Sequence, residues 1–137
     1  MASAAIAELL HRYAWTYDAG DVAGAVACFV EEGTLTTVVA GEEAAVRGQA
    51  ELEAFLGAAR GARAERGEQP RHLVTNVVVS LEDDGAAPRV EAYMTLILTG
   101  ADGARVECTG VYEDRVVETP DGWRFRSRHL RFDRAGA

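Results

Sequence analysis

The sequence contains no lysine, so all 14 of its basic residues are arginine. This absence excludes Schiff-base chemistry, a lysine general base and a phosphate-binding loop that depends on a lysine. Aspartate and glutamate together number 22, which gives the chain a net charge of −8. Because binding to nucleic acid requires a basic face, this acidic balance argues against DNA or RNA as a partner.

Cysteine and long apolar runs are also scarce. The two cysteines, Cys28 and Cys108, lie far apart without a pairing or ligand motif, so we expect buried free thiols and no metal site. No apolar stretch approaches the ~20 residues of a membrane helix, and the N-terminal segment carries Glu8 and no basic leader. We therefore expect a cytoplasmic protein without a membrane partner, in which residues 1–137 form a single domain.

Helices are predicted in the first half of the chain. Apolar residues recur at helical spacing over residues 4–18, and Gly20 is typical of the end of such a helix. Asp21 is typical of the N-cap of a second helix, which would carry Phe29 on its apolar face. A third helix is expected over residues 49–59.

Strands are predicted mainly in the second half. Alternation and β-branched residues indicate strands over residues 34–39, 44–47, 71–81, 89–99, 105–118 and 123–132. The last four are separated by the turns Asp83-Asp84-Gly85, Asp102-Gly103 and Asp121-Gly122, and Asp-Gly is a strong hairpin signal. The second half of residues 57–70, rich in glycine and charge, is expected to be a loop. Helices followed by an antiparallel meander predict an α+β fold with the helices on one face of a curved sheet.

Residues suited to proton transfer gather in two segments. Tyr13, Tyr17 and Asp18 lie at the end of the first predicted helix, where Asp18 is either a solvated residue or the polar edge of a cavity. His72 begins a predicted strand, and alternation places Asn76 on the same face. His72 is therefore either an ordinary histidine of the surface or the core, or part of the wall of a polar cavity together with Asn76.

The last predicted strand alternates arginine with other residues. Arg124, Arg126 and Arg128 fall on one face, which is typical of a solvated or partner-facing stripe. His129 and Arg131 fall on the other face, which also carries aromatic residues. Since a buried arginine needs an anionic or carbonyl partner, Arg131 is a candidate to contact a substrate oxygen.

Four segments together resemble one known family. They are residues 12–21 (RYAWTYDAGD), 71–76 (RHLVTN), 110–114 (GVYED) and 121–125 (DGWRF). In order and spacing they are similar to the SnoaL-like branch of the nuclear-transport-factor-2-like superfamily, which includes dehydratases, a dehydrochlorinase and polyketide cyclases. The resemblance implies a cone-shaped α+β fold, in which a curved, mixed but mainly antiparallel sheet and three N-terminal helices enclose a pocket.

The resemblance also implies roles for individual residues. Asp18 and His72 would form a catalytic dyad, with Tyr13 contacting a substrate oxygen and Arg131, after a one-residue shift, stabilising negative charge. The expected substrate contacts are Tyr17, Phe55, Asn76, Met94, Tyr112 and His129. No cofactor is implied, and relatives of this fold suggest a homodimer formed through the outer face of the sheet.

Two classes of function remain open at this point. The first is a cofactor-independent lyase or isomerase, of dehydratase or cyclase type, that takes a proton from a small hydrophobic cyclic substrate with the Asp18–His72 dyad. The alternative is a non-catalytic ligand-binding or assembly domain that resembles the small subunit of ring-hydroxylating dioxygenases. In that case the stripe of Arg124, Arg126 and Arg128 would contact a partner protein.

Overall fold

The structure is a computed structural model that describes residues 2–82 and 85–133. Its helices are α1 (Ala2–Asp18), α2 (Val22–Val26) and α3 (Gln49–Glu65). Its strands are β1 (Phe29–Val39), β2 (Glu42–Arg47), β3 (Gln69–Ser80), β4 (Arg89–Gly100), β5 (Gly103–Thr119) and β6 (Gly122–Phe132). The predicted α+β class is therefore confirmed, and within the described residues no helix is both long and apolar enough to cross a membrane.

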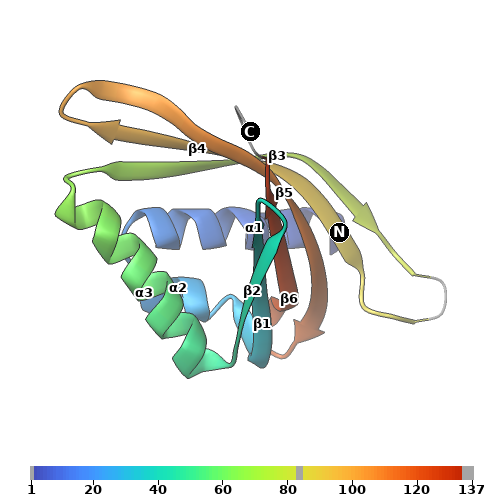
Figure 1. Cartoon of the computed structure of the whole chain (residues 1–137). Coiled ribbons are helices and arrows are strands. Elements are labelled where there is room, and N and C mark those ends of the chain that lie inside the picture. Colours follow the sequence, from blue (N-terminus) through green and yellow to red (C-terminus); the bar gives the residue numbers. More distant parts are fainter. Residues whose placement is uncertain (1, 83–84, 134–137) are drawn as a thin grey trace.

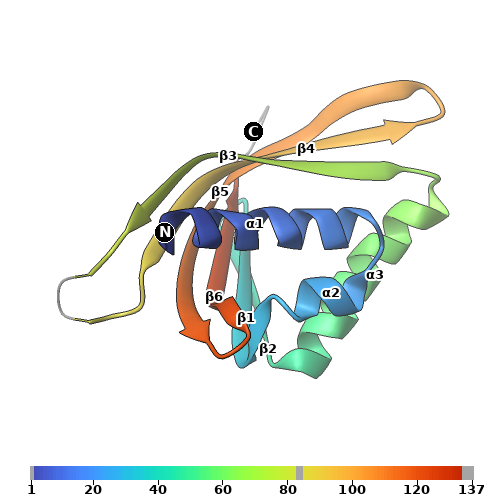
Figure 2. The same cartoon turned by 180° about the vertical axis from the view of Figure 1, so that it is seen from behind.

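The six strands form one bent sheet in the order β2-β1-β6-β5-β4-β3. Every neighbouring pair is antiparallel except β1 and β6, which run parallel, and the sheet does not close because β2 and β3 are its two edges. All three helices lie on the concave side of the bend, with α1 along β3 and α3 near β1 and β2 (Figure 1). The same arrangement is seen from behind in Figure 2.

The first helix is held against the sheet at its C-terminal end. Its apolar stripe is buried as the helical spacing predicts, and Gly20 follows with a φ of 81°, in the left-handed region that glycine adopts without a steric penalty. Arg60 of α3 donates hydrogen bonds to the carbonyl oxygens of Tyr17 (3.2 Å) and Asp18 (3.1 Å). Gln69 donates another to the carbonyl of Asp18, at 2.8 Å. These donors satisfy carbonyl groups that the helix leaves unpaired and fix the position of Tyr17 and Asp18.

Two local predictions are wrong. The segment after residue 59 is not a loop, because α3 continues through Glu65. Gly57 and Gly61 lie inside this helix, where the surrounding alanine and arginine residues favour the helical state enough to offset the cost of two glycines. Phe29 begins β1 instead of extending α2, and it pairs in parallel with Phe125. The turn predicted at Asp83-Asp84 lies outside the described residues.

Four of the five strand pairs show a register shift, and the one between β1 and β6 lies between Phe29 and Thr34. The other three shifts interrupt the alternation of β3, β5 and β6. In β3 the register shifts around Asn76, which has a φ of 56°, and in β5 the extra residue is Glu107. In β6 the extra residue is Arg126, since Ser127 pairs with Arg115 and Phe125 pairs with Val116. An extra residue of this kind is a β-bulge, and it reverses which side chains point to the inner face beyond it.

Candidate functional site

A cavity of about 260 Å³ lies between the helices and the concave face of the sheet. Its lining comes from α1, α3 and every strand except β2, and it is mainly apolar. The polar exceptions are Tyr13, Tyr17, Thr37, Arg63, His72 and Tyr112. An apolar cavity of ~150 Å³ can hold a benzene molecule, so this one suits a ligand of one or two fused rings.

Asp18 and His72 meet at the wall of this cavity. Oδ1 of Asp18 lies 2.6 Å from Nδ1 of His72, and Oδ2 accepts a hydrogen bond from the main-chain nitrogen of His72 at 2.8 Å. An ionised carboxylate only accepts hydrogen bonds, so this contact places the proton of a neutral imidazole on Nδ1 and leaves Nε2 with its lone pair. Within the described residues, Nε2 has no hydrogen-bond partner.

The histidine ring is also fixed by Tyr17. The two rings meet edge to face, with centroids 5.1 Å apart and an interplanar angle of 86°. Both side chains line the cavity, so the contact holds the imidazole in one orientation at the cavity wall.

His72 also borders a second hollow, of about 410 Å³, on the other side of the dyad. This hollow lies between α1 and β3, and its walls include Trp15, which is 74% exposed, and Leu73, which is 41% exposed. Because these residues face the solvent, the hollow is a surface groove. The inner cavity, which is walled by the helices and five strands, is the better candidate for a substrate site.

The buried cation of the last strand is Arg128, not Arg131. The bulge at Arg126 turns Arg128 inward, where Nε and Nη2 donate to the two carboxylate oxygens of Asp114 at 3.0 and 3.3 Å. The guanidinium carbon of Arg128 lies 3.5 Å from the ring centroid of Tyr112, and 4.6 Å from that of Tyr13. This pair therefore lies directly behind two tyrosines that line the cavity.

Burial shifts the pKa values of the groups around this ion pair. Burial raises the pKa of Tyr112 to about 12, although Arg128 opposes the rise. Burial raises the pKa of Tyr13 by a larger amount. Burial also raises the pKa of Asp114 to about 6, although Arg128 opposes the rise. Both tyrosine hydroxyl groups are therefore protonated at neutral pH and can donate hydrogen bonds into the cavity.

Most of the side chains expected at the site do line this cavity. Besides His72, they are Tyr13, Tyr17, Phe55, Met94 and Tyr112, while Asp18 reaches the site through His72. Asn76, His129 and Arg131, which were also expected at the site, do not line this cavity, and both Asn76 and Arg131 are exposed.

The physical reason for these placements is the same in β3 and β6. The bulges at Asn76 and Arg126 reverse the alternation, so His129 and Arg131 fall on the outer face with Arg126. The predicted arginine stripe is therefore broken, because Arg126 is exposed and Arg128 is buried.

Arg63 lines the cavity and was not expected there. The third helix was predicted to end before this residue, but α3 continues to Glu65. A signal was available in the sequence, since Phe55, Ala59 and Arg63 are spaced four residues apart and share one helix face. Across the described part of the chain, no group of three His, Cys, Asp or Glu side chains is arranged to hold a metal ion.

The sequence profile of the SnoaL-like domain family matches residues 2–129 of the chain. No curated protein matches the chain significantly. Among solved structures, Aln2 from a Streptomyces species is 30% identical and superimposes with a TM-score of 0.82, over 96% of this chain and 90% of Aln2.

Two further structures share the fold at lower identity. ActVI-ORFA from Streptomyces coelicolor is 23% identical, with a TM-score of 0.84 over 98% of this chain and 97% of its own. An NTF2-like protein with a cystatin-like fold from Novosphingobium aromaticivorans is 23% identical, with a TM-score of 0.81 over 99% of this chain and 84% of its own. The architecture is thus the NTF2-like fold, and the chain belongs to the SnoaL-like domain family.

Proposed function

We propose that this protein is a cofactor-independent lyase or isomerase, of dehydratase or cyclase type, that acts on a small hydrophobic cyclic substrate. The observation that carries the proposal is the contact between Asp18 and His72 at the wall of an apolar cavity. A histidine that is held by a carboxylate and has one nitrogen without a protein partner, at the wall of a mainly apolar cavity, is suited to abstract a proton.

In the proposed reaction, Nε2 of His72 takes a proton from a carbon atom next to a carbonyl or a leaving group. The Asp18 carboxylate keeps the imidazole in the required tautomer and stabilises the imidazolium that forms. The proton is then available for return to another atom of the substrate or for transfer to a departing hydroxide. Elimination, isomerisation and ring closure share this first step.

The negative charge that develops on the substrate oxygen must be stabilised by hydrogen-bond donors. The hydroxyl groups of Tyr13 and Tyr112 are suited to this role because burial keeps them protonated and no protein group within the described residues accepts a hydrogen bond from them. Arg128 lies behind both rings and adds a positive field at the same end of the cavity. This arrangement supports the stabilisation of an enolate oxygen.

The alternative of an assembly domain receives less support. It rests on the resemblance to the small subunit of ring-hydroxylating dioxygenases, and the partner surface expected for it was an outward stripe of three arginines. Arg128 is instead buried against Asp114. No other feature of the described residues favours a dioxygenase partner over a second copy of this chain.

The test measures proton abstraction directly, so that it does not depend on knowing the final product. A panel of one- and two-ring cyclic ketones and hydroxyketones is incubated with the protein in D₂O, and exchange at the carbon beside the carbonyl is followed by NMR. We expect exchange with at least one compound, and we expect His72→Ala to slow it by about 10²- to 10⁴-fold.

The matched control is His11→Ala, because His11 is an exposed histidine on the same helix as Asp18. This variant should exchange at the wild-type rate. Equal exchange rates in the wild type and in His72→Ala would contradict the proposal.

A further inference from the structure

The cavity lining contains one permanently charged side chain within the described residues, which is Arg63. Its side chain is 22% exposed, so the guanidinium lies at the edge of the cavity where enclosed space meets solvent. The rest of the lining is aliphatic, aromatic or neutral and polar, apart from His72. In a chain with a net charge of −8, a cation at this position needs an explanation.

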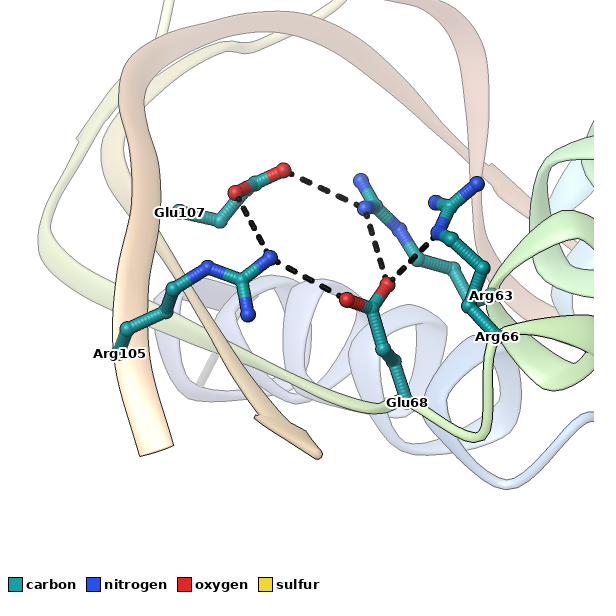
Figure 3. Close-up of polar contacts among 5 residues, drawn as sticks. All are labelled: Arg63, Arg66, Glu68, Arg105 and Glu107. Carbon is teal, nitrogen blue, oxygen red and sulfur yellow. Dashed lines mark hydrogen bonds and ion pairs between the residues drawn. The ribbon is translucent and has the colours of Figure 1, made fainter. Parts of the chain in front are cut away.

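Arg63 belongs to a network with Arg66, Glu68, Arg105 and Glu107 (Figure 3). Glu68 is bound at 3.0 Å by Arg66 and at 3.2 Å by Arg105, and these hydrogen bonds lower its pKa. Glu107 is bound by Arg105 at 3.4 Å. Both carboxylates therefore have a cationic partner that lies outside the cavity lining.

Arg63 contacts the same carboxylates, as closely as Arg105 does at Glu107 but at a longer distance than Arg66 and Arg105 do at Glu68. Its Nη1 lies 3.4 Å from Glu107 and 3.9 Å from Glu68, and both contacts use this single nitrogen. The network holds three arginines against two glutamates, so one positive charge is left without a matching negative charge. The arginine with the longest contacts is also the one that borders the cavity, and its Nε and Nη2 have no partner within the described residues.

The position of this cation relative to the proposed reaction centre is defined by Tyr17. The ring of Tyr17 contacts the ring of His72, and both side chains line the cavity together with Arg63. Burial raises the pKa of Tyr17, and the guanidinium groups of Arg63 and Arg60 partly offset this rise, which indicates that Arg63 lies near the phenol. A ring bound in the cavity can therefore touch His72 while a substituent reaches Arg63.

We propose that Arg63 binds a carboxylate group of the substrate, which makes the substrate class a one- or two-ring carboxylic acid. This inference rests on the proposed function, because it names the substrate of that same site. The planar guanidinium fork has two parallel N–H groups that match the geometry of a carboxylate, and a partly desolvated position strengthens the pair. The carboxylate supplies the negative charge that the network lacks.

The test uses binding, without turnover, of two probes with the same shape. The probes are 2-naphthoate, which is anionic at pH 7.5, and 2-naphthamide, which is neutral, and their affinities are measured by isothermal titration calorimetry. We expect the wild type to prefer the acid, and Arg63→Gln to weaken binding of the acid by about 10- to 100-fold without a comparable effect on the amide.

Two further variants separate charge recognition from damage to the fold. Arg12→Gln removes a half-exposed cation that pairs with Glu8 on α1, outside both the network and the cavity lining, and it should leave binding of the acid within about twofold of the wild type. Glu107→Gln removes the carboxylate that competes for Arg63, and it should strengthen binding of the acid by about two- to fivefold. A gain of affinity of this kind does not arise from unfolding.

The proposal is overturned if the wild type does not bind 2-naphthoate at millimolar concentration. It is also overturned if Arg63→Gln binds the acid as tightly as the wild type does, or if this variant loses affinity for the acid and for the amide to the same extent. The same titrations on His72→Ala keep the two proposals apart. If the protein still prefers the acid over the amide, but His72→Ala exchanges protons as fast as the wild type, then the proposed reaction is wrong and the proposed carboxylate site stands.

Discussion

Asp18 uses both of its carboxylate oxygens on one residue, His72, binding its main-chain nitrogen with one and its ring with the other. The main-chain contact joins the end of α1 to the beginning of β3, and the ring contact sets the orientation of the imidazole. The position of the ring and the position of the strand are therefore determined by the same side chain. A substitution at Asp18 tests both.

We expect Asp18→Asn to change the tautomer of His72. The amide of asparagine can present a donor to Nδ1, which moves the imidazole proton to Nε2 and removes the lone pair that the proposed reaction requires. Nitrogen chemical shifts of the histidine side chains, measured by NMR at pH 8, should show Nδ1–H in the wild type and Nε2–H in the variant. An unchanged tautomer would contradict the positioning role, and His11 provides an exposed reference signal in the same spectrum.

We expect the buried pair of Arg128 and Asp114 to be sensitive to removal of one partner. Asp114→Ala leaves the guanidinium buried without its counter-ion and should lower the free energy of unfolding by about 3–5 kcal/mol, measured by urea denaturation. The double variant Arg128→Met/Asp114→Leu removes both charges, so its free energy of unfolding should fall much less. Glu113→Ala, at the exposed neighbouring position, should change stability by less than about 0.5 kcal/mol.

The buried tyrosines predict a loss of stability at high pH. The folded protein keeps Tyr112 neutral until about pH 12, whereas an unfolded tyrosine ionises near its ordinary pKa of 10. The stabilisation is thus complete below pH 10 and is lost as the pH rises from 10 to 12, with a contribution from Tyr112 of about 3 kcal/mol. Urea denaturation between pH 10 and 12 should show that the free energy of unfolding falls less steeply in Tyr112→Phe than in the wild type. An identical fall in both proteins would show that Tyr112 ionises freely in the folded state.

The outer face of the sheet predicts a homodimer. Leu73, Val78 and Tyr93 are 41%, 55% and 56% exposed, and they lie close together on the paired strands β3 and β4. Light scattering at micromolar concentration should therefore give twice the chain mass of 14.7 kDa. Tyr93→Arg should shift the protein toward monomer. A monomeric wild type would refute this prediction, whereas Val106→Arg, at an exposed position near the β4–β5 hairpin end, should leave the dimer intact.

The elements follow from patterns that are local in the sequence, whereas the pairing of Asp18 with His72 follows from the resemblance to the SnoaL-like family. A helix stripe that ends at Gly20 places Asp18 at a helix terminus, and a strand that begins near His72 places the histidine at a sheet edge. Contact between the two then requires only that α1 packs along β3, which is what a helix on an edge strand of a bent sheet does.

The side chains that were misplaced depend on information of another kind. Whether Arg128 or Arg131 points inward is decided by one extra residue, Arg126, and alternation alone gives no sign of it. At Asn76 a sign did exist, since asparagine tolerates a positive φ better than the β-branched residues around it. Arg63 was missed because two glycines suggested a break in a helix that its other residues sustain.

The parallel pairing of β1 with β6 joins segments from opposite ends of the chain. The strands β3 to β6 are linked consecutively through antiparallel pairs, so each of their pairings closes a short loop and costs little chain entropy. Pairing β1 with β6 must close most of the polypeptide at once, and we expect it to be the slow step of folding. Because β1 and α3 supply a wall of the cavity, the ligand site comes into existence only at this step. A ligand that binds there will consequently slow unfolding by holding together the two ends of the sequence.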